Sequence, residues 1–267
     1  SGSNDFQTLF VAGKATVCAR DHNTGLPKGL SGVRIDESLR GGAGMKMIAK
    51  FSRKGAACYM SHLDLLRCVQ RTLRRANMPL AYSQGFNPHP ILSFAQAMGV
   101  GLATIGDYFE VGLEENLEPE AFAAAFNACA TPGVHVIQAR QAEEKEKTIM
   151  SQVEAATYRF QLEKQLQTAM KDALIKLMAA PEYLFEKKSK SGVKQENMRP
   201  RILQAEFQDV SIEAQLSCGN DNLQPKAFWQ ALCDLSGVQS QPQILRIELW
   251  RKEKDAFTPL SQSPSLI

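Results

Sequence analysis

The chain has 267 residues, with 31 Lys and Arg, 28 Asp and Glu, and a formal charge of +3. This length accommodates one large or two ordinary domains, and 44% hydrophobic with 22% charged residues is typical of a globular chain with a buried core. A charge this small does not indicate nucleic-acid binding, so such a function would have to rest on local clusters of basic residues.

Cysteine spacing and hydropathy exclude several classes of protein. The six cysteines are far apart and form no C-x-x-C pair, so we expect reduced thiols and neither a zinc ribbon nor an iron–sulfur cluster. No run of 18 apolar residues is present, which predicts neither a membrane span nor a signal peptide. We therefore expect a cytoplasmic protein that does not contact a membrane.

The first part of the chain predicts one domain. Residues 1–44 show no sustained period, and we expect them to be a disordered, expression-derived or upstream segment. Alternation and helical spacing from Met45 onward predict the order βαββαβ within residues 45–142. The expected strands are Met45–Phe51, Ile91–Ala95, Asp107–Leu113 and Val134–Arg140, and the expected helices are Ser61–Asn77 and Pro119–Cys129.

The rest of the chain predicts the same order again. Residues 143–156, with the charge run Glu143–Lys147, are an expected linker, and residues 157–253 form the second domain. Residues 254–267 are an expected frayed tail. The second set of elements is Tyr158–Glu163, a helix over Leu166–Met178, Tyr183–Lys188, Val210–Leu216, a helix over Pro225–Leu235, and Ile244–Trp250, with Ile202–Phe207 extending the middle strands.

A repeat in the letters supports this reading. LEPEAFAAAF from Leu117 and LQPKAFWQAL from Leu223 share Leu, Pro, Ala, Phe and Ala at matching positions, and proline suits the first position of both helices. We predict an α+β protein of two tandem ferredoxin-like βαββαβ domains from an internal duplication, with antiparallel sheets and helices on one face. The alternative is chance similarity between two amphipathic helices.

The first predicted helix carries a basic face. Ser61 is placed to cap the helix and Asp64 to complete a capping box. At 100° per residue the apolar side chains fall on one face and four arginines fall on the other. These are Arg67, Arg71, Arg74 and Arg75. They predict either a solvated stripe, in which Asp64 pairs with Arg67, or a site for phosphate or carboxylate groups.

A stiff polar loop is expected after this helix. Pro88 and Pro90 keep the residues before them out of helical angles, so the loop should present its side chains in fixed directions. The mix of polar and aromatic residues suits a ligand or unstacked RNA bases, whereas the alternative is a structural crossover loop. The candidate binding residues are Tyr82, Ser83, Gln84, Phe86, Asn87 and His89.

Histidines supply the candidate catalytic groups. His62 and His89 are the residues we expect to act as general acid or base if the chain catalyses a reaction, although His62 also suits a buried, hydrogen-bonded role. The two histidines with Asp64 make a poor ligand set, so we predict no metal site and no cofactor.

Basic residues also cluster in the second half. They are Lys187, Lys188, Lys190, Lys194, Arg199 and Arg201. The alternatives are a solvated hairpin edge and an RNA contact.

The segment from Phe51 to Ala95 resembles a family of uncharacterised bacterial radical-SAM-linked proteins. The similarity is carried by FSRKG, by YMSHLDLLRCVQRTLRRANMPLAYSQGFNPHPILSFA, and further on by MRPRI. Among the matching positions are Lys54 and Arg199, which the resemblance adds to the candidate site. The sequence departs from the family pattern at FAQAMGVGLATIGDY, which puts contacts made by that loop in doubt. The resemblance implies a radical-SAM enzyme as partner, while the chain lacks the C-x-x-x-C-x-x-C run that holds such an enzyme's own cluster.

Together these features favour an accessory binding protein without activity of its own. It is expected to recognise RNA or a ribosome-related substrate and to work with a separate radical-SAM enzyme. Two alternatives stay open: a metal-independent RNA-processing or transferase-type enzyme that uses His62 or His89, and a protein-only scaffold.

Overall fold

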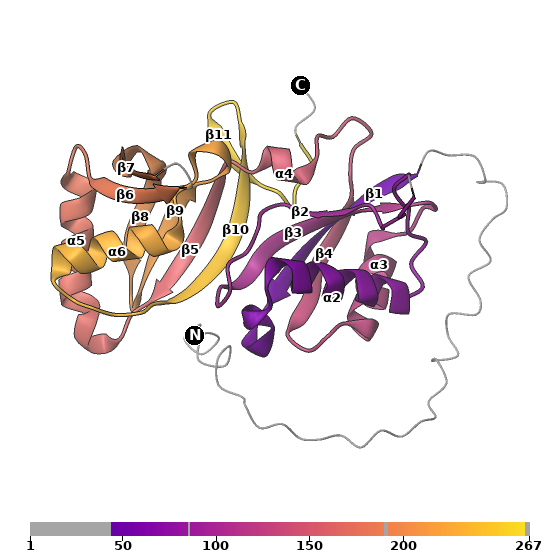
Figure 1. Cartoon of the computed structure of the whole chain (residues 1–267), viewed down its shortest axis with the longest axis horizontal. Coiled ribbons are helices and arrows are strands. Elements are labelled where there is room, and N and C mark those ends of the chain that lie inside the picture. Colours follow the sequence, from indigo (N-terminus) through magenta and orange to yellow (C-terminus); the bar gives the residue numbers. More distant parts are fainter. Residues whose placement is uncertain (1–43, 85, 190–191, 265–267) are drawn as a thin grey trace, which may run out of the picture.

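A computed structural model describes residues 44–84, 86–189 and 192–264 of the chain. Apart from Gly44, the predicted disordered segment 1–44 lies outside the described residues. The structure is a mixed α/β arrangement in which helices pack on a large, mostly antiparallel sheet (Figure 1).

The elements follow the chain in two halves. The first half comprises β1 (Met45–Arg53), α2 (His62–Arg75), β2 (Leu92–Phe94), β3 (Ala103–Leu113), α3 (Pro119–Cys129) and β4 (Val134–Gln141). A short helix α4 (Ile149–Gln152) connects it to the second half, which comprises β5 (Ala155–Gln161), α5 (Gln167–Ala179), β6 (Leu184–Ser189), β7 (Gly192–Asn197), β8 (Ile202–Gln208), β9 (Ser211–Ser217), α6 (Pro225–Ser236), β10 (Gln243–Glu253) and β11 (Ala256–Pro259). None of the helices in the described ranges is long and apolar enough to cross a membrane.

One sheet runs through both halves. Its strand order is β4-β1-β3-β10-β5-β9-β8, with β2 also paired to β3 and β11 to β10. The halves meet through a parallel contact in which Leu245 and Arg246 of β10 pair with Ala103 and Thr104 of β3, whereas the other pairs are antiparallel. The prediction of separate sheets is therefore wrong.

The start of β3 explains that error. We expected this strand to begin at Asp107, but it begins at Ala103, and the additional residues make the contact with β10. A Cβ atom added to Gly106 would lie 1.8 Å from the carbonyl oxygen of Ile247, so the two backbones approach at a distance that only glycine permits. Gly106 and Thr104 made this stretch look like a loop.

Two further expectations need correction. The predicted strand at Tyr183–Lys188 is not in the main sheet: β6 pairs with the unexpected strand β7 in a separate two-stranded sheet, and β8 takes the place beside β9. The tail was expected to fray, yet β11 pairs with β10 and Leu260 is fully buried. A frayed tail is therefore wrong for these residues.

The main core lies between the sheet and the helices on one of its faces. In the first half the ring of Phe109 on β3 contacts Phe122 and Phe126 of α3. In the second half Phe160 on β5 contacts Phe228 and Trp229 of α6. The helices of the first half and those of the second half thus lie on either side of the junction between β3 and β10 (Figure 1).

Candidate functional site

The helix α2 presents its basic face to solvent. Ser61 caps it as predicted: the Asp64 N–H donates to Ser61 Oγ at 3.2 Å, and this hydroxyl donates to Asp64 Oδ2 at 2.7 Å. The apolar face is buried through Leu65, Val69 and Leu73, which fixes the rotation of the helix. The four arginines on the opposite side, Arg67, Arg71, Arg74 and Arg75, are all exposed. We call them the arginine face.

The members of the arginine face differ in their partners. Arg67 forms an ion pair with Asp64 at 3.5 Å, and both side chains are mostly exposed. Arg75 donates to the carbonyl of Cys129 at 2.7 Å and to Thr72 at 3.1 Å, so its guanidinium is fixed against the end of α3. Within the described part of the chain, the side chains of Arg71 and Arg74 have no hydrogen-bond or ion-pair partner. An exposed ion pair contributes little to stability, so most of this face is available to a ligand.

The predicted stiff loop is a hairpin that projects from the first half. Tyr82 and Pro90 form an isolated β-bridge, and Ser83 N–H donates to the His89 carbonyl at 2.9 Å. The ring nitrogen Nδ1 of His89 also lies 2.9 Å from Ser83 Oγ. Phe86, between the two sides, is fully exposed. We call residues 82–90 the 82–90 hairpin, of which all but Gly85 are described.

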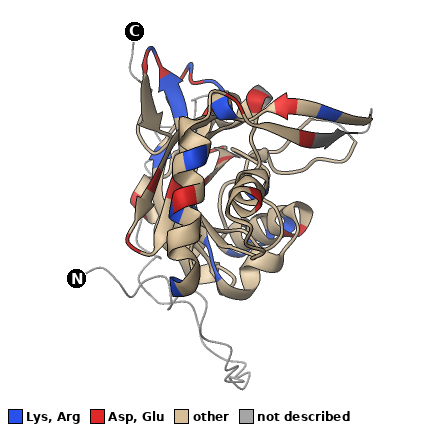
Figure 2. Cartoon of the chain, turned by 90° about the vertical axis from the view of Figure 1, so that its left-hand side faces the viewer, with Lys and Arg blue, Asp and Glu red and all other residues tan. Residues whose placement is uncertain are grey.

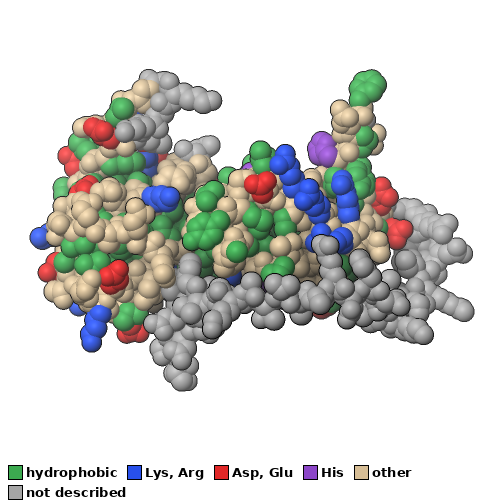
Figure 3. Space-filling model, turned by 60° about the horizontal axis from the view of Figure 1, so that its bottom comes forward, with side chains coloured by type: hydrophobic (Ala, Val, Ile, Leu, Met, Phe, Trp, Pro, Cys, Tyr) green, Lys and Arg blue, Asp and Glu red, His purple; other side chains and the backbone are tan. Residues whose placement is uncertain are grey.

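The hairpin and the basic residues share one surface. Figure 3 shows a stripe of Lys and Arg side chains beside a projection that ends in a hydrophobic side chain. The candidate residues of the hairpin are at least partly exposed, including Gln84 and Asn87. By contrast, Lys and Arg positions alternate with Asp and Glu positions along the ribbon at the end of the molecule formed by the second half (Figure 2).

The resemblance-derived residues lie apart from each other. The Lys54 N–H donates to the Gly133 carbonyl at 2.8 Å, beside the segment in which Thr131 accepts a hydrogen bond from Cys68 of α2. Arg199 instead donates to the Met178 carbonyl from Nε at 3.3 Å, and it joins the end of α5 to the start of β8. The structure therefore does not bring Arg199 to the arginine face.

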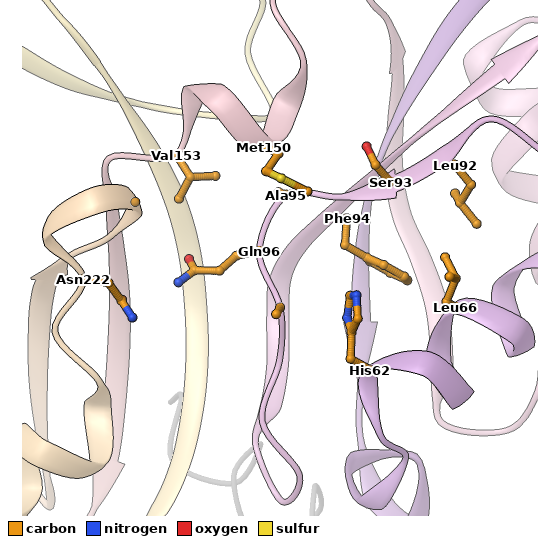
Figure 4. A pocket seen from close by; sticks show the side chains of 12 residues that line it. His62, Leu66, Leu92, Ser93, Phe94, Ala95, Gln96, Met150, Val153 and Asn222 are labelled. Carbon is orange, nitrogen blue, oxygen red and sulfur yellow. The ribbon is translucent and has the colours of Figure 1, made fainter. Parts of the chain in front are cut away.

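His62 lies in a pocket rather than on the arginine face. Its ring packs edge-on against Phe94 with centroids 5.4 Å apart, and its Nδ1 atom is buried without a partner in the described chain. The pocket has a volume of about 450 Å³. In Figure 4 the His62 ring rises from the start of α2 beside Phe94, while Gln96 extends toward Asn222 of the second half. His62 and His89 thus have different neighbours, and the described residues contain no group of three or more His, Cys, Asp or Glu that could hold a metal ion.

Buried charged residues at the junction are the group that sequence reasoning missed. Arg246 of β10 forms a 2.7 Å ion pair with Asp107 of β3 and donates to the Tyr158 hydroxyl of β5 at 3.1 Å. Complete burial raises the pKa of Asp107, and the adjacent Arg246 charge opposes that rise. Burial likewise raises the pKa of Tyr158, to about 12. The available signal was a charged residue inside each apolar strand, as in GDYFEV and LRIELW.

On the opposite face of the sheet a second group joins β1, β3 and β10. Lys50 of β1 pairs with Glu248 of β10 at 2.6 Å, and the Tyr108 hydroxyl of β3 donates to the same carboxylate. Polar bonds therefore join the halves through both faces of the sheet.

Comparison with known proteins gives a family without an assigned activity. Residues 46–225 match the family described as an uncharacterised protein conserved in bacteria, DUF2344. The chain belongs to this family. The match covers α2, the 82–90 hairpin and the junction strand β3.

Other comparisons add little. No curated protein matches the chain. A crystal structure of an unknown protein from Galdieria sulphuraria is similar at 10% identity, over 73% of this chain and 91% of that chain, with a TM-score of 0.23. At this TM-score the likeness supports no conclusion about fold or function.

Proposed function

We propose that this chain is an accessory protein that recognises RNA or a ribonucleoprotein through the arginine face and the 82–90 hairpin. The observation that supports it is the pairing of two exposed guanidinium groups, on Arg71 and Arg74, which have no partner in the described ranges, with a projecting hairpin whose Phe86 ring is fully exposed. An exposed ring at a hairpin tip buries nothing within the chain. Such a ring therefore suits contact with another molecule.

The chemistry of both elements suits unpaired RNA. Guanidinium groups bind phosphate oxygens and give affinity without sequence preference. Exposed aromatic rings stack on unpaired bases, and Tyr82 and Phe86 supply two rings on one hairpin. The imidazole of His89 and the amide of Asn87 add hydrogen-bonding groups for base edges. Ser83 holds the His89 ring in place, so this contact would be preorganised.

We also propose that the two halves are ferredoxin-like repeats. This is supported by their strand orders, β4-β1-β3-β2 in the first half and β10-β5-β9-β8 in the second. In both, the first strand lies between the third and the fourth, and a helix follows the first strand and the third. The β6–β7 hairpin is then an insertion of the second repeat. Tandem repeats of this kind give a rigid support for a projecting loop.

A radical-SAM enzyme is the partner we propose. The support is the resemblance carried by the segment from Phe51 to Ala95, which includes both parts of the proposed site. Co-purification of a radical-SAM enzyme with the tagged chain, measured before and after ribonuclease treatment, tests this partnership. Loss of the enzyme on ribonuclease treatment would indicate an RNA bridge, whereas its retention would indicate direct contact and favour the protein scaffold.

The salt dependence of RNA binding tests the proposed site. Binding of a labelled single-stranded RNA is measured at several salt concentrations for the wild type and for an Arg71→Ala/Arg74→Ala variant. Each lost phosphate contact to a single strand lowers the slope of log affinity against log salt by about 0.7, so we expect the slope to fall by about 1.4.

A charge-matched control separates local contact from general electrostatics. The Lys164→Ala/Lys176→Ala variant removes two exposed charges from the second half and should retain the wild-type slope. An equal decrease in both variants would contradict the proposed site, and no binding by the wild type would contradict RNA recognition by the chain alone.

One observation favours an enzymatic alternative. His62 lines a pocket, and its Nδ1 atom has no hydrogen-bond partner among the described residues, so the imidazole is a candidate to exchange a proton with a ligand bound there. If the chain cleaves RNA with this group, His62→Ala should abolish turnover and leave RNA affinity within about twofold of wild type. If the chain only binds RNA, neither the wild type nor His62→Ala should show turnover.

A further inference from the structure

A second cavity at the junction, of about 630 Å³, is built by both halves. Gly99 to Leu102 of the first half form one wall, and the first turn of α6 forms the other. Tyr158 of β5 and Arg246 of β10 also line it. A volume in this range is typical of sites for small molecules.

The charges around this cavity are not balanced. Arg246 and Lys226 line it, and no Asp or Glu is among the described residues of the lining. The guanidinium of fully buried Arg53 lies directly behind one wall, where it donates to the Gly99 and Leu102 carbonyls at 2.8 Å each. Positive groups therefore act on the cavity from both sides.

Two buried guanidinium groups, those of Arg53 and Arg246, lie near a single carboxylate of the described chain, that of Asp107. Among the described residues, Asp107 pairs with Arg246, whereas Arg53 has carbonyl partners and no carboxylate within ion-pair distance. Burial lowers the pKa of Arg53, Cys58 and the more distant Asp107 oppose this, and the charge of Arg246 lowers it further. A buried charge without a counter-charge is costly, so an anion in the adjacent cavity would be stabilised by this surplus.

The rest of the lining suits the uncharged organic part of a molecule that carries an anionic group. The buried Trp229 ring is fixed by its stacking on Phe160 and by donation from Nε1 to the Ser240 carbonyl at 3.0 Å. Pro242 and Ile244 add apolar surface beside it. Four glutamines of the lining carry amide groups that can donate and accept: Gln96, Gln224, Gln230 and Gln241.

We propose that this cavity binds a small organic anion, one carrying a phosphate or a carboxylate, whose charged group contacts Lys226 and the Arg246–Tyr158 pair. The body of the molecule lies against Trp229. Because both halves form the walls, the occupant bridges them. The site is separate from the arginine face, and it does not depend on RNA recognition.

Calorimetric titration of the full chain with three probes tests the site: inorganic phosphate, adenosine monophosphate and succinate. We expect saturable binding that Lys226→Glu weakens at least about tenfold, since a hydrogen bond to a charged group is replaced by repulsion. An acidic residue is favourable in the first turn of a helix, so this variant should fold. Lys164→Glu, at an exposed position away from the cavity, should bind as the wild type does.

The pattern of binding distinguishes the possible anions. Adenosine monophosphate and phosphate without succinate would identify a phosphate site, and succinate alone a carboxylate site. Val100→Trp, at a half-exposed position of the lining, should fill the cavity and weaken the same probe. The proposal is overturned if none of the probes binds the wild type, or if binding survives both Lys226→Glu and Val100→Trp.

Discussion

Arginines define two contrasting regions of this molecule. On α2, Arg71 and Arg74 extend into solvent and have no partner among the described side chains and carbonyls. At the junction of the halves, Arg53 and Arg246 are almost completely buried and their guanidinium groups bond to carbonyls, to Asp107 and to Tyr158. The same side chain therefore serves two different purposes in one chain.

The difference shows how burial decides what an arginine does. An exposed guanidinium keeps its hydration and costs the fold little, so it is free to exchange water for a phosphate. A buried guanidinium must be bonded within the protein, because an unpaired charge in the interior is costly. We therefore expect a change to the partners of the junction arginines to alter stability first, whereas a change to the α2 arginines should alter binding and leave stability nearly unchanged.

The largest effect is expected where a buried charge loses its partner. Asp107→Ala leaves Arg246 without its carboxylate, and we expect the free energy of unfolding to fall by about 3–5 kcal/mol. Urea denaturation at neutral pH measures this change.

A partly exposed ion pair provides the control for this variant. Glu213→Ala removes the carboxylate partner of the more exposed Arg159 and should cost less than about 1 kcal/mol. Similar losses from the two variants would show that burial does not separate these ion pairs as argued.

A smaller effect is expected from alkaline pH at the same junction. The pKa of Tyr158 is raised to about 12 by burial, so its neutral form stabilises the folded state fully below pH 10, the ordinary value for tyrosine. That contribution is lost as the pH rises from 10 to 12, because the unfolded chain ionises first. We expect a decrease of about 3 kcal/mol attributable to this group, from two pKa units at about 1.4 kcal/mol each.

Comparison of tyrosine variants isolates the contribution of Tyr158. Urea denaturation at pH 9, 10 and 11 should show a shallower decrease for Tyr158→Phe than for the wild type. Tyr82→Phe, which removes an exposed hydroxyl, should retain the wild-type decrease. An unchanged decrease in Tyr158→Phe would contradict the prediction.

Local patterns predicted most elements but not their association. The capping residues Ser61 and Asp64 and the proline at the start of α3 located both first-half helices, because these signals depend on residues next to each other. The continuous sheet depends on Ala103 to Gly106 meeting β10 across more than a hundred residues. A glycine required by backbone approach looks the same in the sequence as a glycine required by a turn.

The elements of the candidate site were also predictable from local patterns, but the contacts that its residues make with distant segments were not. Helical spacing placed the arginine face on the exposed side of α2, and the prolines indicated a stiff loop at 82–90. Neither signal could reveal that Arg75 is bonded to Cys129 or that Arg199 holds the end of α5, because those contacts are made by segments distant in the chain. The anion cavity was not predicted either, because its walls come from segments that are distant in the chain.

The smallest effect on stability is expected at the tip of the 82–90 hairpin. Phe86 is fully exposed, so Phe86→Ala should change the free energy of unfolding by less than about 0.5 kcal/mol. If the ring stacks on a base, the same variant should weaken binding of single-stranded RNA by about 1–3 kcal/mol. Phe86→Tyr keeps the ring face and should bind nearly as the wild type does. Filter binding of the three proteins to one RNA measures the loss of affinity. Full affinity in Phe86→Ala would show that the hairpin tip does not contact the RNA. The arginine face would still be tested separately by the salt dependence of binding.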